Sequence, residues 1–324
     1  MPQVSIVIVC MNRPDILFPC LDSIRTHTTV SYETLVVAYL FSQENLALLQ
    51  ERYPWVKVVQ STELRGFSEN NNLALRQAKG RYCFIVNDDT LMHEPVIDRL
   101  VRDLESLPEN AAAISPCICF GDGRIQTCGR TPWTAWRYAK HYLHWVDEGR
   151  TEGALGPTSE EKYFSCGCSK NHFSSDIATP THDHELLQTY TLNGACFLIK
   201  TAVFRKMGWF DERYFFTPED IALGHALNDA GYSVWVHPQV CITHLAGGSV
   251  SAMEQAIKPA RVRGSLIFYG EPLWLKCFVW SVELARYVKN SLLCREQNRK
   301  TARNVMKTVF SQQTPKEIFI RFKP

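Results

Sequence analysis

The sequence lacks the signatures of several large enzyme classes. It contains neither a Gly-x-x-x-x-Gly-Lys-Ser/Thr loop nor a Gly-x-Gly-x-x-Gly fingerprint, which argues against an NTPase and against a dehydrogenase. Ser249 lacks the flanking elbow of a hydrolase nucleophile. Repeats and low-complexity segments are also missing. The 324 residues, 45% of them hydrophobic, are therefore expected to form one large globular domain, alone or with a helical appendage.

Long hydrophobic runs are absent as well. The first apolar run, Val4 to Cys10, is short and has no small-residue cleavage site behind it, so we expect a strand and no secretion signal. The stretch from Pro272 to Leu293 is more apolar, but charged residues within it argue against a membrane span: Lys276, Glu283, Arg286 and Lys289. We expect an amphipathic helix there, lying on a membrane or packed on the body of the protein.

The 12 cysteines show no regular spacing, and several lie in apolar runs, where free cysteine behaves as a small hydrophobe. This usage is typical of a reducing compartment and predicts a cytoplasmic protein. Cys166-x-Cys168, His172 and His182-x-His184 lack the spacing of a zinc finger or ribbon. Scattered thiols in a polar acceptor loop are the favoured interpretation over a structural zinc site.

The net charge of +2 hides an asymmetry between the body and the tail of the chain. The tail from Lys276 to Pro324 carries 11 Lys or Arg and 3 Glu, a charge of +8, and the preceding residues carry −6. A basic tail predicts an anionic partner, a membrane surface or nucleic acid, with a solvated helix face as the alternative. Our prediction is a peripheral position on the inner face of the plasma membrane and no nucleic-acid partner.

Short β-branched runs alternate with helical patterns in the first part of the chain. The expected strands are Val4–Cys10, Thr34–Leu40, Val56–Gln60, Tyr82–Val86 and Ala111–Ser115. Strict alternation of strand and helix predicts an α/β fold with a doubly wound, mostly parallel sheet.

The second part of the chain departs from this alternation. Residues 121–191 are rich in Gly, Thr, Ser, His and aromatic residues and are interpreted as an acceptor-side insertion. Order returns with a strand at Ala195–Ile199, a helix that Thr201 caps, a helix that opens at Pro218, and a strand pair at Val234–Val236 and Val240–Ile242. We therefore expect one catalytic domain over residues 1–250 and a basic helical region over 251–324.

The strongest local signal is Asn87-Asp88-Asp89-Thr90, directly after an apolar strand. The carboxyl ends of parallel strands border the crevice in which open α/β sheets bind ligands. Two adjacent carboxylates there favour a hard divalent cation, which would bridge the phosphate oxygens of a nucleotide. The alternative is an ordinary Asp-rich turn that ends a strand.

The residues around this motif carry a family resemblance. Leu64-Arg65-Gly66-Phe67, the asparagines Asn70 to Asn72, and Ala78-Lys79-Gly80-Arg81-Tyr82 lead into the Asn-Asp-Asp strand. This order resembles family 2 glycosyltransferases of the GT-A fold, especially the rhamnosyltransferase-like branch that builds bacterial surface polysaccharides. The resemblance implies that Asp89, with Asp88 beside it, holds Mg²⁺ or Mn²⁺ against the donor diphosphate. It also implies donor contacts from Asn12, Arg13, Arg65, Gly66, Asn72, Asn87 and Asp88.

The second half of the chain continues the resemblance. Asn193-Gly194-Ala195, Gly208-Trp209-Phe210-Asp211-Glu212 and Pro218-Glu219-Asp220 follow in the family order. The resemblance implies that Asp220 is the catalytic base, with Glu219 as an acceptor or structural partner, and that Asn193, Gly194, Ala195 and Trp209 face the acceptor. One carboxylate is what an inverting transfer needs to take the proton of the attacking hydroxyl. The alternative is that both acids only complement the helix dipole.

Two further segments refine the implied site. His244 in His-x-x-Gly-x-Ser is implied as a metal ligand, and Gly121-Asp122-Gly123-Arg124-Ile125-Gln126 is a weaker echo of the rhamnosyltransferase-like members. One departure concerns the nucleotide base, because the family usually has Asp where this chain has Ala38. Either Tyr39, Ser42 or Glu44 substitutes for it, or Arg65, Asn72 and the metal hold the donor.

These residues together predict a metal-dependent inverting glycosyltransferase. It would transfer a sugar, rhamnose or another hexose, from a nucleotide-diphosphate donor to a lipid-linked or oligosaccharide acceptor in a growing surface glycan such as O-antigen or capsule. Two alternatives stay open: a nucleotidyltransferase that makes a sugar nucleotide, and a non-catalytic subunit of a polysaccharide assembly complex.

Overall fold

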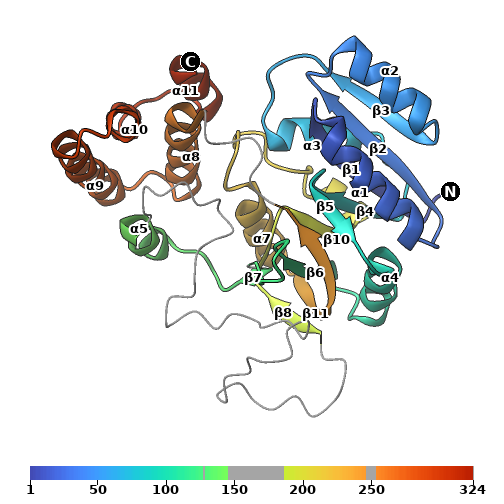
Figure 1. Cartoon of the computed structure of the whole chain (residues 1–324). Helices are drawn as coiled ribbons and strands as arrows, with labels where there is room; N and C mark the ends of the chain where they lie inside the picture. Colours follow the sequence, from blue (N-terminus) through green and yellow to red (C-terminus); the bar gives the residue numbers. More distant parts are fainter. Residues whose placement is uncertain (127, 145–185, 246–252, 324) are drawn as a thin grey trace.

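The first half of the central sheet is parallel, as the alternation of strands and helices predicts. β1 (Val4–Met11) lies between β2 (Tyr32–Tyr39) and β4 (Tyr82–Val86), and β3 (Val56–Ser61) lies beyond β2. The crossovers contain α1 (Pro14–His27), α2 (Gln43–Arg52) and α3 (Phe67–Leu75). The computed structural model describes residues 1–126, 128–144, 186–245 and 253–323 (Figure 1).

The second half of the sheet is mixed. β10 (Cys196–Lys200) runs antiparallel between β4 and β6 (Ala111–Cys119), and β6 pairs in parallel with β11 (Ser233–His244). β5 (Thr90–Met92) and β8 (Leu187–Thr189) are antiparallel to β11. Because β10 starts beside the end of β4, with Cys196 opposite Val86, the turn before β10 lies at the same sheet edge as the Asn-Asp-Asp motif.

Several predicted elements have different bounds in the structure. The expected strand pair at Val234–Val236 and Val240–Ile242 is wrong, because both segments belong to the single strand β11, whose register against β6 shifts between His237 and Cys241. β6 continues four residues beyond Ser115. Lys200, not Thr201, is the N-cap of α6 (Thr201–Lys206). The periodicity of side chains identified the strands, but it did not distinguish a bulge from a turn.

The remaining helices cover the sheet or connect its second half. α4 (Val96–Ser106) buries Val96, Ile97, Leu100, Val101 and Leu104 in the main core. α7 (Glu219–Asp229) precedes β11, and β7 (Gly129–Arg130) pairs with β9 (Thr191–Leu192) in a small second sheet. Of the predicted insertion, residues 145–185 lie outside the described residues, and so does the Cys166-x-Cys168 segment.

The C-terminal helices form a second packed group beside the sheet (Figure 1). It consists of α8 (Glu254–Phe268), α9 (Leu273–Leu292), α10 (Glu296–Val309) and α11 (Pro315–Phe322), together with α5 (Ala135–His144). Glu283 of α9 is fully buried and bonds the Tyr142 hydroxyl at 2.6 Å, Arg286 at 2.6 Å and Lys258 at 3.3 Å. Such a network ties α5, α8 and α9 together. Among the described residues, no helix has the length and apolar character needed to cross a membrane.

Candidate active site

Asp89 and His244 meet at the carboxyl edge of the sheet. Antiparallel pairing of β5 with β11 sets His244 opposite Thr90, and the His244 Nε2 lies 3.1 Å from the Asp89 Oδ1. The other ring nitrogen, Nδ1, lies 2.8 Å from the Oε1 of Gln126, whose amide nitrogen donates to the His244 carbonyl at 3.0 Å. Because Gln126 holds one ring nitrogen, the imidazole presents the other to Asp89 and to the Asn87 amide, 3.3 Å away.

Asp88 lies on the other side of the motif, beside Cys10 at the end of β1. Burial raises the pKa of the Asp88 carboxyl to about 6, the Cys10 thiol opposes that rise through a hydrogen bond, and the neighbouring Asp89 charge adds to it. Burial also raises the pKa of the Cys10 thiol far above its usual range, so this thiol is a donor and not a nucleophile. Two adjacent carboxylates, with an imidazole held against one of them, are a donor set that fits Mg²⁺ or Mn²⁺.

The turn Asn193-Gly194-Ala195 connects this group to the predicted base. The Asn87 N–H donates to the Ala195 carbonyl at 2.9 Å, and the Gly194 N–H donates to the Asp220 Oδ2 at 3.2 Å. The Asn193 side chain accepts from the Ala195 N–H at 2.9 Å, which closes the turn. In space, the turn of residues 193–195 therefore lies between the end of β4 and the start of α7. These three residues, predicted for the acceptor side, thus stand between the Asp88-Asp89 pair and Asp220.

The two acids at the start of α7 differ in exposure. Glu219 is buried, with 7% of its surface exposed, whereas Asp220 is partly exposed. The Asp220 Oδ1 accepts from the Ile221 N–H at 2.7 Å. Asp220 therefore accepts from two backbone N–H groups, of which only that of Ile221 belongs to α7, and it still reaches the surface. Of the two, Asp220 is the carboxylate that an acceptor hydroxyl can approach.

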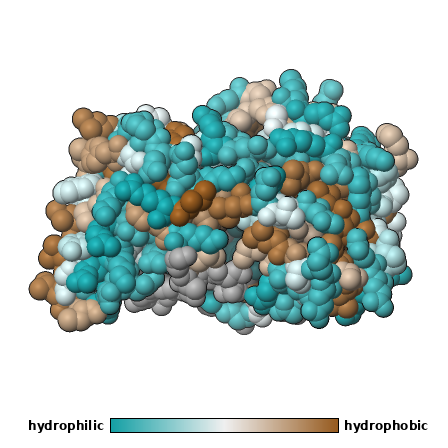
Figure 2. All heavy atoms as spheres, turned by 90° about the horizontal axis from the view of Figure 1, so that it is seen from above, coloured by the Kyte–Doolittle hydropathy of each residue, from teal (hydrophilic) through white to brown (hydrophobic). Residues whose placement is uncertain are grey.

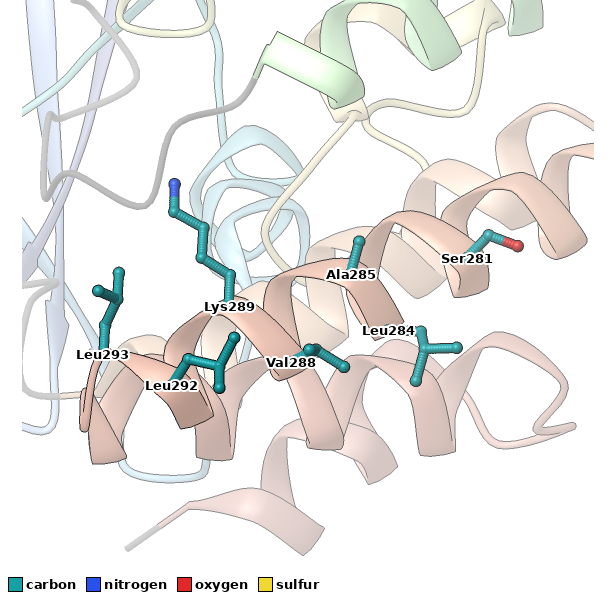
Figure 3. A pocket seen from close by; sticks show the side chains of 7 residues that line it. All are labelled: Ser281, Leu284, Ala285, Val288, Lys289, Leu292 and Leu293. Carbon is teal, nitrogen blue, oxygen red and sulfur yellow. The ribbon is translucent and has the colours of Figure 1, made fainter.

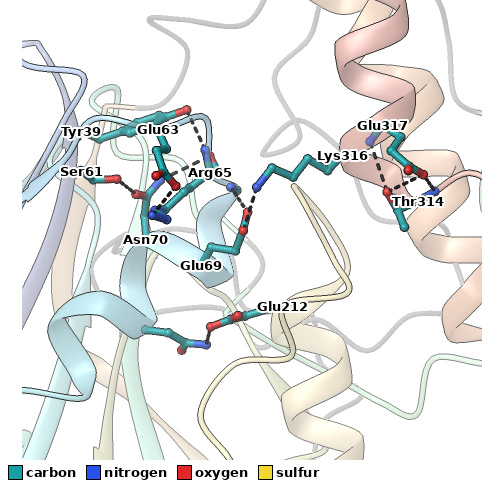
Figure 4. Close-up of polar contacts among 12 residues, drawn as sticks. Tyr39, Ser61, Glu63, Arg65, Glu69, Asn70, Glu212, Thr314, Lys316 and Glu317 are labelled. Carbon is teal, nitrogen blue, oxygen red and sulfur yellow. Dashed lines mark hydrogen bonds and ion pairs between the residues drawn. The ribbon is translucent and has the colours of Figure 1, made fainter.

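Arg65 and Gly66 lie in a loop that is held by close contacts with Tyr39 and Phe215. Figure 4 shows the Tyr39 hydroxyl against the Arg65 backbone, whose N–H donates to it at 3.3 Å, and Arg65 paired with Glu63 at 2.6 Å. Gly66 is packed so closely on Phe215 that a Cβ there would lie 2.2 Å from the Phe215 carbonyl oxygen. This contact links the Arg65 loop to the chain segment that leads into Asp220.

Three predicted donor or acceptor residues are engaged in structural contacts. Asn72 is buried, and its amide bonds the Phe210 backbone at 2.9 and 3.1 Å and Glu212 at 2.8 Å. Asn12, at φ +52°, accepts from the Ser42 N–H at 3.0 Å and the Asn45 amide at 2.9 Å. Trp209 packs edge-on against Phe204.

Asn72 and Trp209 line a groove of about 650 Å³, together with Arg76, Glu212, Arg213 and His225. The structure thus brings together Asp89, His244, Asn87, the 193–195 turn and Asp220 through direct contacts, with Asp88 beside Asp89. Arg13 pairs with Asp15 at 2.8 Å at the surface, in the loop that follows β1.

The region predicted to hold the nucleotide base has no acidic residue at position 38. Ala38 is buried, with 2% exposure, and the Ser42 hydroxyl caps α2 by accepting from the Asn45 N–H at 3.2 Å. Tyr39 is also buried and bonds Arg65, as described above. Of the three substitutes considered from the sequence, Tyr39 and Ser42 are thus engaged in contacts within the protein.

Two features of the site region were missed by sequence reasoning. Gln126 orients His244, and the only sequence signal for it was the weak echo at residues 121–126. Cys117, Cys119 and Cys241 bring their sulfur atoms within 4.8 Å of one another on the neighbouring strands β6 and β11. The Cys-x-Cys spacing on a strand, which puts both side chains on one face, was the signal for that cluster.

Comparison with known proteins identifies the family of the chain. The model of a family described as "Glycosyltransferase like family 2" matches residues 2–261, most of the chain. The chain belongs to this glycosyltransferase family. The match covers both the Asp88-Asp89 motif and the Asp220 and His244 segments, so the predicted family resemblance is confirmed.

Relatives with assigned names are surface-polysaccharide proteins. The chain is 27% identical over 251 residues to the O-antigen biosynthesis protein RfbC of Myxococcus xanthus, covering 75% of this chain and 17% of that protein. It is 30% identical over 122 residues to the N-acetylglucosaminyl-diphospho-decaprenol L-rhamnosyltransferase of Mycobacterium tuberculosis, covering 36% of this chain and 39% of that protein. The chain thus spans well under half of the length of each of these relatives. Their names agree with the rhamnosyltransferase-like branch.

Solved structures confirm the GT-A fold. GalNAc-T7 with UDP, GalNAc and Mn²⁺ gives a TM-score of 0.54 at 15% identity, covering 75% of this chain and 44% of that one. The mannosyltransferase PcManGT of Pyrobaculum calidifontis with GDP-Man and Mn²⁺ gives 0.52 at 14% identity, covering 98% of this chain and 85% of that one. At these identities the likeness concerns the fold alone.

Proposed function

We propose that this family 2 glycosyltransferase is metal-dependent and inverts the configuration of the transferred sugar. The observation that carries the proposal is the pairing of Asp89 with His244 at one end of the 193–195 turn and of Asp220 with Gly194 at the other. Asp88, Asp89 and His244 would hold Mg²⁺ or Mn²⁺, which, when bound, offsets the charge of the departing diphosphate.

The protein groups supply positioning and one proton acceptor. Asp220 takes the proton from the acceptor hydroxyl while that oxygen forms a bond to the anomeric carbon. The bond from the anomeric carbon to the diphosphate breaks on the opposite face, and its electron pair leaves with the phosphate oxygen. The Gly194 N–H keeps the Asp220 carboxylate oriented, and Arg65 borders the donor side.

For the substrates, the named relatives support a surface-glycan acceptor. We propose a nucleoside-diphosphate hexose, rhamnose included, as the donor, and a lipid-linked or oligosaccharide acceptor of an O-antigen or capsule type at the inner face of the plasma membrane. The Mycobacterium tuberculosis relative is named for a diphospho-decaprenol compound, which has the chemistry of such a lipid-linked acceptor.

A donor screen followed by a transfer assay tests the proposal. Thermal shifts with UDP, GDP and dTDP sugars, each with and without Mn²⁺, identify the donor, because a bound ligand stabilises the folded state by mass action. Asp220→Asn should bind that donor as well as wild type but lose transfer by roughly 10³-fold or more. Asp89→Asn should lose the Mn²⁺-dependent shift. Full transfer by Asp220→Asn would overturn the assignment of the base.

The nucleotidyltransferase alternative makes a different prediction in the same assays. It requires pyrophosphate release from a nucleoside triphosphate and a sugar phosphate, with no transfer from a sugar nucleotide. The non-catalytic alternative requires neither reaction. Detection of a transferred sugar whose anomeric configuration is opposite to that of the donor excludes both.

A further inference from the structure

Helix α9 turns three of its four charged side chains toward the protein, leaves Lys289 exposed, and presents a row of apolar side chains to solvent. The exposed fractions of Lys276, Glu283 and Arg286 are 13%, 0% and 11%, because Glu271, Tyr142 and Lys258 pair with them inside the helical group. On the outer side, Leu273, Trp274, Leu284, Val288 and Leu292 are exposed by 69%, 45%, 39%, 49% and 80%. A soluble helix normally has the opposite polarity.

These outer residues form one continuous stripe. Leu273, Cys277, Trp280, Leu284, Val288 and Leu292 recur every three or four residues, so they share one side of a helix about 30 Å long. Figure 3 shows Leu284, Val288 and Leu292 following one another along α9, with Leu293 at its end. Figure 2 shows apolar side chains gathered along the edge of the molecule where α9 lies in Figure 1.

The neighbouring helix α10 carries the complementary feature. α9 and α10 pack against each other, and exposed cations recur at four-residue spacing from the N-cap of α10 along the helix: Arg295, Arg299, Arg303 and Lys307. An apolar stripe beside a row of Lys and Arg is the pattern of helices that lie in the interface of an anionic membrane.

We propose that this α9–α10 face, defined by the apolar stripe of α9 and the cationic row of α10, docks on the surface of an anionic phospholipid bilayer. The apolar side chains enter the boundary between headgroups and acyl chains, and the cations contact lipid phosphates. A second copy of the chain is the less suitable occupant, because a twofold contact through this face would bring two cationic rows together.

The inference deepens the proposed function by identifying the surface that would bring a lipid-linked acceptor to the enzyme. Only the statement about the lipid-linked acceptor rests on the proposed function. Docking itself follows from the exposure and charge of α9 and α10, so it can be measured on the full chain without any substrate.

Vesicle sedimentation tests the docking. The full chain is mixed with vesicles of phosphatidylcholine alone or of phosphatidylcholine and phosphatidylglycerol in equal amounts, at low and high salt. We expect binding to the anionic vesicles, weakened by salt. The double variant Leu284→Glu/Val288→Glu should lose binding by about tenfold or more. Leu48→Glu, an equally exposed leucine in α2, is the matched control and should bind like wild type.

Three results would overturn the proposal. These are no binding of the wild type to anionic vesicles at low salt, equal binding by the double variant and the wild type, or a dimer in light scattering that the double variant dissociates. Thermal unfolding of each variant separates lost docking from lost folding. Transfer to a soluble acceptor should be unchanged in the double variant, so a failure of the catalytic proposal, seen as no transfer by any variant, is distinguishable from a failure of docking.

Discussion

The Lys316 ammonium of α11 lies 2.9 Å from the Glu69 carboxylate of α3, although 247 residues separate them in the sequence (Figure 4). The same carboxylate accepts from the Gly66 N–H at 2.9 Å. The last helix of the chain thus contacts the residue that fixes the Arg65-Gly66 loop. Phe319 of α11 also packs at a tilt against the ring of Phe215, at 5.1 Å between ring centroids, and the backbone of Phe215 in turn contacts Gly66 of that loop.

Loss of the Lys316–Glu69 contact is predicted to weaken donor binding without a large loss of stability. Lys316→Met should lower the free energy of unfolding by less than about 1 kcal/mol, because both partners are partly exposed. It should raise the KM for the donor more than it changes kcat, since the Arg65 loop loses its brace. Urea unfolding and steady-state kinetics measure both effects. Lys307→Met, an exposed lysine of α10, is the control, and an equal KM change in it would refute the brace.

Replacing Gln126 is predicted to weaken metal binding through the contact of this residue with His244. Gln126→Leu removes the group that holds the His244 Nδ1, so the ring loses its fixed orientation. Loss of such a partner typically weakens metal binding by roughly 10- to 100-fold. Mn²⁺ titration followed by thermal shift, without substrate, measures the change. Gln126→Glu keeps an acceptor for the ring and should retain most of the affinity, whereas equal Mn²⁺ binding by Gln126→Leu and wild type would contradict this role.

The sequence predicted the parts of the site that are local and left out those that depend on distant partners. The Asn87 to Asp89 motif after a buried strand, and Asp220 at a helix start, are local patterns, and the structure has both where they were expected. The donor contact of Asn72 stays a prediction, and the structure adds a bond from its amide to Glu212, 140 residues away, that the sequence did not indicate. No periodicity reveals such a pairing, because the contact forms only after α3 and the loop before α7 have packed together.

The same limit applies to the fold. The four parallel strands could be predicted from alternating β-branched runs. The antiparallel insertion of β10 between β4 and β6 could not, because strand direction is set by the topology of the connection and not by the composition of the strand. In α9 the charges correctly argued against a membrane span, but only the tertiary structure shows that several of them face inward.

The ion pairs of Glu271 are predicted to make part of the free energy of unfolding depend on pH. Hydrogen bonds from Arg263 and from Lys276 lower the pKa of the Glu271 carboxyl to about 2 from its usual 4.5. The bonds from Arg263 have the largest effect, and they outweigh the partial burial of Glu271, which raises this pKa. Because the folded-state pKa is the lower one, the stabilisation is complete above about pH 4.5 and is lost as the pH falls toward about 2. Glu271→Gln should therefore cost up to about 3 kcal/mol at neutral pH and progressively less below pH 4.5.

Urea unfolding of wild type and Glu271→Gln across this pH range measures the difference. Glu296→Gln is the matched control, since Glu296 pairs with Lys300 on the exposed side of α10. Lys300 also lowers the pKa of the Glu296 carboxyl, but this pair is exposed and screened by solvent, so Glu296→Gln should differ from wild type far less than Glu271→Gln at every pH. A stability difference for Glu271→Gln that does not shrink in acid would show that the loss comes from packing and not from the ionised carboxylate.

Replacing Gly66 is predicted to create a steric clash that lowers both the stability of the fold and the affinity for the donor. A methyl group at this position would lie 2.2 Å from the Phe215 carbonyl oxygen and 2.8 Å from its Cα, and both are backbone atoms that cannot rotate away. Gly66→Ala must therefore push the Arg65 loop off the Phe215 segment, which should lower the free energy of unfolding by roughly 1–3 kcal/mol. The shift also breaks the hydrogen bond from the Phe67 N–H to the Phe215 carbonyl, 3.0 Å long in the wild type. Donor binding should weaken together with stability. Gly121→Ala, where the added methyl meets only a Leu245 side-chain atom at 3.5 Å, should leave both unchanged, and a Gly66→Ala protein that unfolds and binds donor like this control would disprove the close backbone contact.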